Sequence, residues 1–289
     1  MSLRAVATAL FAVIAFGGGV ASAAGPAPEP PAWPEAIQDN SFLIEEAYNQ
    51  EPGVVQWIFG FQYVRETRNW QNTFTSEWPV PDERNQLSVT VPFSTKPNDG
   101  GADGVGDVLL NYRRQLLGGS DRGWWFAPRL SAVLPTGDWR GGTGNGAWGA
   151  QVNLPWSRRL SADFAAHLNV GGTWIPRARF VDDAGRPFRA ESSNVSAGAS
   201  LIWHTTPVFN LLLEVVGVRV RTPIAPGVTE STNQLIVSPG MRRAFNFKSG
   251  QLVLGAALPI GATKDSPDPG VFLYVSWEAP VWKSRAAKR

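Results

Sequence analysis

The segment from Val54 to Arg65 reads VVQWIFGFQYVR, and its side chains alternate in character at every position. Odd positions carry large apolar or aromatic groups, whereas even positions carry smaller or polar ones such as Gln56 and Gln62. Successive side chains of a β-strand point to opposite faces, so this segment predicts a strand with one apolar face and one half-polar face. Such a strand fits either a soluble β-sandwich or a membrane barrel whose apolar face meets lipid.

The same alternation recurs along the chain beyond residue 50. Its clearest example is Leu160–Trp174, LSADFAAHLNVGGTW, in which apolar side chains fall on one parity and polar ones on the other. The segment 209–220 alternates less cleanly, because Arg219 and Arg221 share the parity of its leucines. This irregularity predicts either a β-bulge or a strand that leaves the membrane before Arg219.

Short and longer connections alternate between the expected strands. HTTP at 204–207 is short, whereas PTGDWRGGTGNG at 135–146 and the segments 175–191, 221–231 and 261–270 are expected to be long loops. Outer-membrane barrels show this alternation, with short periplasmic turns and longer outside loops. The sequence therefore predicts an all-β fold, a transmembrane antiparallel up-and-down β-barrel of about twelve strands over residues 54–282.

The N-terminus predicts export. Arg4 precedes an apolar run from Ala5 to Phe16, and Ala21-Ser22-Ala23 matches the small-residue pattern of a cleavage site. We expect residues 1–23 to be a cleaved signal peptide, because the apolar run is shorter than the roughly 20 residues of a spanning helix. The alternative is an uncleaved anchor.

Three further segments flank the expected barrel. Residues 24–40 begin with five prolines in thirteen residues, which predicts an extended periplasmic leader. Residues 41–53 form an N-terminal segment that could plug the lumen, cap the periplasmic mouth or lie under the barrel as a short helix, with Glu45, Glu46 and Tyr48 as plug candidates. Residues 283–289 form a basic C-terminal tail.

Composition excludes two classes of protein. Removal of Arg4 with the signal leaves 25 basic against 24 acidic residues, a net charge of +1, which argues against a nucleic-acid partner. The chain has no cysteine, so it is not a disulfide scaffold.

Tryptophan marks the ends of the expected strands, where aromatic girdles anchor barrels at the two membrane interfaces. The alternative is ordinary core packing in a soluble sandwich. The girdle candidates are Trp57, Trp124, Trp148, Trp156, Trp174, Trp203 and Trp277.

The polar face is expected to line a lumen. Charged members of this face either form a constriction that orients a polar or anionic solute, or pair with one another inside a narrow, filled barrel. The lumen candidates are Gln56, Gln62, Asp107, Asn111, Arg113, Arg129, Gln151, Asn153, Asp163, His167, Asn169, Glu214, Arg242 and Glu278.

Three stretches together point to a family: DNSFLIEEAYNQEPGVVQWI at 39–58, GVGDVLLNYRRQLL at 104–117 and PTGDWRGGTGNGAWG at 135–149. The set resembles the outer-membrane transporter family labelled "MetA-pathway of phenol degradation" over most of the mature chain. The resemblance implies an outer-membrane barrel that takes up small, often aromatic, molecules. One departure is the tail KSRAAKR, since such barrels usually end on an aromatic residue.

No signature of catalysis or of a cofactor stands out. The two histidines fall in different expected strands, there is no G-x-S-x-G motif, and GGTGNG lacks the Lys-Ser/Thr of a phosphate loop. We therefore expect no enzyme activity, no catalytic residues, no metal and no cofactor.

The predicted function is passive passage of small solutes, including aromatic or hydrophobic ones, across the outer membrane. The expected partners are outer-membrane lipid, the solute and the outer-membrane insertion machinery. Two alternatives remain: a non-transporting structural or surface-interaction barrel, and a soluble periplasmic β-sandwich that binds a ligand.

Overall fold

The computed structural model describes residues 37, 41–65, 68–95, 103–267 and 269–281. The predicted signal peptide, the leader apart from Ile37, and the C-terminal tail lie outside these residues. The described strands are β1 (Val54–Val64), β2 (Asn69–Pro79), β3 (Asn85–Thr95), β4 (Gly104–Val105), β5 (Leu109–Arg114), β6 (Leu117–Gly119), β7 (Trp124–Phe126), β8 (Arg129–Val133), β9 (Gly149–Arg159), β10 (Phe164–Val181), β11 (Pro187–Thr206), β12 (Phe209–Ala225), β13 (Val228–Phe247), β14 (Gly250–Ala257), β15 (Ile260–Gly261) and β16 (Val271–Pro280).

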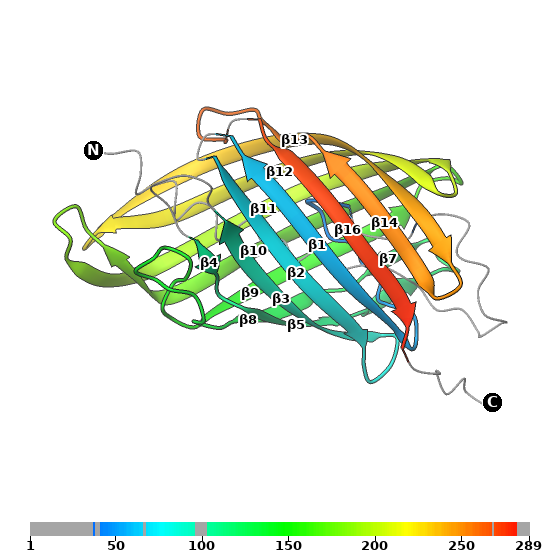
Figure 1. Cartoon of the computed structure of the whole chain (residues 1–289), viewed down its shortest axis with the longest axis horizontal. Coiled ribbons are helices and arrows are strands. Elements are labelled where there is room, and N and C mark those ends of the chain that lie inside the picture. The colour runs from blue at the N-terminus through cyan, green and yellow to red at the C-terminus, as the bar shows by residue number, and fades with distance from the viewer. Residues whose placement is uncertain (1–36, 38–40, 66–67, 96–102, 268, 282–289) are drawn as a thin grey trace.

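These strands close into a barrel of twelve antiparallel strands, as the alternation predicts. Each long strand pairs with its neighbours in the chain, and β1 also pairs with β16, which closes the cylinder (Figure 1). The short strands β4, β6, β7 and β15 extend this wall locally. No helix in the described part of the chain is long and apolar enough to cross a membrane.

The outside of the barrel is apolar, and the inside combines buried polar side chains with apolar ones such as Leu212, Val216 and Val218. On β1, Phe59 is 37% exposed, whereas Gln56 is fully buried. On β12, Leu211, Leu213 and Val215 are exposed, while Glu214 between them is buried. A closed barrel has no second sheet to cover this outer face, so the sandwich interpretation is wrong. An apolar exterior of this extent is the surface that a barrel presents to lipid.

The predicted loops at 175–191 and 221–231 are mostly strand. β10 and β11 continue to a turn at 182–186, and β12 and β13 to a turn at Pro226-Gly227, where Gly227 adopts a φ of 77°. Continued pairing satisfies the backbone hydrogen bonds that loops would leave to water. Figure 1 shows both hairpins reaching beyond the rest of the barrel at one end.

Of the two alternatives for the segment near Arg219, the β-bulge is wrong, whereas a strand that leaves the apolar belt before Arg219 agrees with the structure. Arg219 pairs with Asn233 and Arg221 with Ser231 in regular register, and the β12–β13 register first shifts between Pro223 and Ala225. The two arginines are exposed on the outer face because the strand runs on past the end of the apolar stretch.

The two rims of the barrel differ. β1 begins and β16 ends at one rim, here called the terminal rim, which also carries the short turns at 160–163, 207–208 and 248–249. The opposite rim, here called the loop rim, carries the long connections 134–148 and 258–270. The predicted alternation of short and long connections therefore holds for these loops.

Candidate functional site

Residues 41–50, here called the inner segment, lie inside the barrel. All ten are buried, and none is in a helix or strand. Their hydrogen bonds reach wall side chains on β3, β5, β8, β9, β10, β11 and β12. A segment with partners on strands around the barrel occupies the lumen, and it is neither a cap outside the mouth nor a helix beneath it.

Glu45 is held at both its side chain and its backbone. Arg129 Nε lies 2.9 Å from Glu45 Oε1 and 3.0 Å from Oε2, and Arg113 Nη1 lies 3.3 Å from Oε1. Asn153 Nδ2 also donates to Oε2. Asn169 accepts from the Glu45 amide at 2.8 Å and donates to its carbonyl at 2.6 Å. The wall therefore binds both the side-chain carboxylate and the backbone of Glu45.

Arg113 and Arg129 are direct cross-strand partners in the β5–β8 register. Two like charges in this position repel each other, so Glu45 between them supplies a stabilising opposite charge. Arg113 also donates to Asn49 Oδ1 at 3.0 Å and to the carbonyl of Tyr48. One wall arginine thus binds several residues of the inner segment.

Glu46 points to a second basic group. Its Oε1 lies 3.8 Å from Arg242 Nη2 and 3.5 Å from His167 Nε2. His167 Nδ1 lies 2.7 Å from Ser157 Oγ, and that hydroxyl oxygen accepts from the Ala47 amide at 2.8 Å. The carboxylates of the two neighbouring glutamates therefore contact different strands of the wall.

Glu214 on β12 binds the start of the inner segment through its backbone. Its carboxylate accepts hydrogen bonds from the amides of Phe42, Leu43 and Ile44 at 3.2, 2.9 and 3.0 Å. A carboxylate that collects consecutive amides makes charge-assisted bonds, which are stronger than neutral ones. This contact sets the direction in which the chain enters the lumen.

Glycines in the wall make room for the apolar side chains of the inner segment. A Cβ at Gly255 would lie 2.5 Å from Phe42 ring atoms, and one at Gly240 would lie 2.7 Å from the same ring. A Cβ at Gly198 would lie 2.5 Å from Ile44 Cδ1. Only a residue without a side chain allows these close approaches.

The end of the inner segment packs near the terminal rim. The Tyr48 ring meets the Trp125 ring edge-on, with centroids 4.5 Å apart. The Gln50 amide donates to Gln86 Oε1 at 2.9 Å, and the Gln50 side chain donates to Gln56. These contacts complete the polar filling of the lumen.

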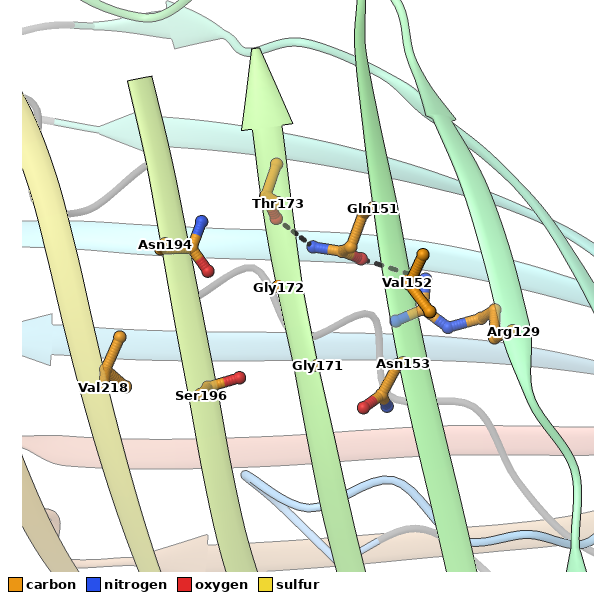
Figure 2. Close-up of a pocket in the computed structure, with 10 residues that line it drawn as sticks. All are labelled: Arg129, Gln151, Val152, Asn153, Gly171, Gly172, Thr173, Asn194, Ser196 and Val218. Atoms are coloured by element: carbon orange, nitrogen blue, oxygen red, sulfur yellow. Dashed lines mark hydrogen bonds between the residues drawn. The ribbon is translucent and has the colours of Figure 1, made fainter. Parts of the chain in front are cut away.

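A polar cavity adjoins the Glu45 site on the side of the loop rim (Figure 2). Its empty space, counting the open mouth, is about 300 Å³. Gln151 Nε2 donates to Thr173 Oγ1 at 2.9 Å, and Arg129 Nη1 donates to Gln151 Oε1 at 3.1 Å. The lining residues are Arg129, Gln151, Val152, Asn153, Gly171, Gly172, Thr173, Asn194, Ser196 and Val218. Within the described ranges no three His, Cys, Asp or Glu side chains converge as metal ligands.

The structure places most of the lumen candidates inside the barrel. Gln151 and Glu278 are half-buried there. The fully buried candidates on the strands are Gln56, Gln62, Asn111, Arg113, Arg129, Asn153, His167, Asn169, Glu214 and Arg242.

Two candidates lie outside the strands. Asp163 is exposed in the turn between β9 and β10, so its assignment to the lumen is wrong. Asp107 precedes β5, and its carboxylate accepts from the Gly137 amide at 2.9 Å and from the Asn145 amide at 2.8 Å. It fastens the 134–148 loop. Asp107 is nevertheless buried, at 6% exposure, whereas Asp163 was misassigned because alternation was extended into a turn, where side chains no longer alternate.

The girdle candidates lie near the two rims. Trp148 and Trp174 are exposed near the loop rim, at 63% and 51%. Trp203 is exposed near the terminal rim, and Trp57 pairs there with Trp277 across β1 and β16. The half-buried members of the set are Trp57, Trp124, Trp156 and Trp277.

Several residues that hold the inner segment were missed. Gln86 and Ser157 lie on the buried parity of β3 and β9, so the alternation of those two strands is the signal that could have found them. Ser41, Asn49 and Gln50 carry no periodic signal, because the inner segment has no regular structure.

Comparison with known proteins supports the fold. No family model matches the sequence, and no curated protein matches it. The chain is similar to the crystal structure of an outer-membrane channel from Pseudomonas putida, with 14% identity and a TM-score of 0.60, over 81% of this chain and 97% of that one. It is also similar to the NanC porin, with 9% identity and a TM-score of 0.51, over 77% and 98% of the two chains. The chain thus has the fold of an outer-membrane β-barrel.

Proposed function

We propose that the protein is an outer-membrane channel that passes small solutes passively, and that the inner segment plugs the path in the state described. The observation that carries this proposal is the polar lumen, in which hydrogen bonds and ion pairs hold the inner segment. Water can replace these polar contacts when the segment leaves, and the burial of Phe42, Leu43 and Ile44 against the wall is the contribution that opposes its departure.

The surroundings of the barrel belong to the same proposal. Outer-membrane lipid would contact the apolar exterior and the tryptophans near both rims. Residues 1–23 would direct export and be removed, residues 24–40 would lead from the periplasm to the lumen, and the outer-membrane insertion machinery would place the barrel. The family resemblance adds to this proposal that the solutes include aromatic or hydrophobic molecules. Membership of that family stays a prediction.

A reversible lock tests the plug. Ser41 Oγ on the inner segment donates to Ser200 Oγ on β11 at 2.8 Å, so Ser41→Cys with Ser200→Cys places two thiols within bonding reach. The chain has no cysteine of its own, so no other thiol competes. In planar bilayers we expect the oxidised double variant to conduct less than the unmodified protein, and dithiothreitol to restore its conductance.

The two single-cysteine variants are the controls, and neither should respond to oxidation. Equal conductance of the oxidised and reduced double variant would show that the inner segment does not gate the path.

The alternative function is a non-transporting barrel. The filled lumen of the described state favours this alternative. Absence of conductance from the inserted protein, oxidised or reduced, would support it and contradict the channel.

A further inference from the structure

We propose that Arg113 and Arg129 form a carboxylate-binding site of the channel, which Glu45 occupies here and which the carboxylate of a small solute occupies when the inner segment leaves. This inference rests on the proposed function, because it requires the segment to move. It names the class of solute as small organic carboxylates.

The first support is that the wall itself orients the arginines. Arg129 Nη1 donates to Asn111 Oδ1 at 3.0 Å, to Ser131 Oγ at 2.5 Å and to Gln151 Oε1 at 3.1 Å. Arg113 Nη2 donates to Gln86 Oε1 at 3.0 Å. These partners belong to strands, so they remain when the inner segment leaves, and the guanidinium groups keep their directions.

The second support is the fit to two oxygens. Arg129 Nε reaches both oxygens of the Glu45 carboxylate, Arg113 reaches one of them, and Asn153 reaches the other. Every one of these donors comes from the wall. A preorganised set of donors around one carboxylate binds any carboxylate of suitable size, whichever molecule carries it.

The third support is the cost of leaving the site empty. Arg113 and Arg129 are 1% and 4% exposed and face each other directly across two strands. Two buried like charges in this arrangement favour an anion between them. Departure of Glu45 therefore creates a vacancy that a solute anion would fill.

The fourth support is access. Arg129 and Asn153, which hold Glu45, also line the cavity of about 300 Å³ on the side of the loop rim (Figure 2). The enclosed part of this space is only about 10 Å³, room for about one water molecule, so a solute can occupy the site only after the inner segment has left. A solute in this cavity would therefore lie beside two of the donors of the carboxylate site.

Benzoate and benzamide test the proposal, because they have nearly the same shape and only benzoate carries a carboxylate. With the full-length protein in planar bilayers, we expect sodium benzoate to raise the open fraction by competing with Glu45, and benzamide at the same concentration to leave it unchanged. In Arg129→Gln, the benzoate concentration that gives half the effect should rise about tenfold or more.

The matched control is Arg219→Gln, which removes an exposed arginine from the outer face. It should respond to benzoate as the unmodified protein does. If Arg129→Gln fails to form a folded barrel, Arg129→Lys keeps the charge without the fork of donors and should also weaken the response.

Equal effects of benzoate and benzamide, or a normal benzoate response in both Arg129 variants, would show that the site only anchors Glu45. The channel function would survive that result. A protein that conducts under no condition, including after reduction of the Ser41–Ser200 lock, would contradict the channel function instead.

Discussion

Phe42 lies against Gly255, and a Cβ at that glycine would meet two atoms of the Phe42 ring at 2.5 Å. The contact joins the start of the inner segment to β14, more than two hundred residues away in the sequence. It shows that the filling of the lumen depends on apolar fit as well as on charge.

Gly255→Ala should therefore loosen the inner segment. The added methyl group cannot share space with the Phe42 ring, so the ring must move and the open fraction in planar bilayers should rise. Gly217→Ala is the control, because a Cβ there meets no atom closer than 3.8 Å. Equal open fractions of the two variants would show that the Phe42 contact does not hold the segment.

Glu214→Gln should weaken the binding of the start of the inner segment to the barrel wall. Three backbone amides donate to the carboxylate, and hydrogen bonds to a charged group contribute about 1.5–3 kcal/mol. Hydrogen exchange at Phe42, Leu43 and Ile44 should speed up by about ten- to a hundredfold. Glu230→Gln near the loop rim should leave these rates alone, and unchanged rates in Glu214→Gln would contradict the assignment.

Asp107→Ala should free the 134–148 loop. The carboxylate accepts from the amides of Gly137 and Asn145, so its loss removes these two of the bonds that join the loop to the segment before β5. Trypsin should then cut after Arg140 faster than in the unmodified protein. Asp121→Ala, at a highly exposed carboxylate, serves as the control, and equal cleavage rates would show that other contacts order the loop.

Leu213→Arg should destabilise the folded barrel. Leu213 is exposed on the outer face of β12 within the apolar stretch, and an arginine near the membrane midplane costs about 2–4 kcal/mol. Urea unfolding in lipid vesicles measures the change. Asn233→Arg, beyond the apolar stretch on β13, should cost much less. A similar loss of unfolding free energy in both variants would show that Asn233 also lies within the membrane.

Alternation of side chains predicted correctly which residues of the strands face inward, but it predicted the ends of the strands poorly. The side-chain period of two assigned Arg113, Arg129 and Glu214 to the inner face, because each lies within a regular strand. The same rule misplaced Asp163, which lies in the turn just before β10. It also predicted loops where the β10–β11 and β12–β13 hairpins continue as strands. Polar side chains there mark the end of the apolar belt and not the end of the strand.

The sequence by itself determined that this chain forms strands with one apolar and one more polar face, because alternation is a property of neighbouring residues in one strand. It left open whether those strands close into a barrel or pack as a sandwich. It could name Glu45 and Glu46 as plug candidates, but it could not choose between lumen, mouth and an underlying helix. Only the tertiary structure brought Glu45 between Arg113 and Arg129, and Phe42 onto Gly255. Those contacts join residues far apart in the chain, and closure of the barrel decides which of them meet.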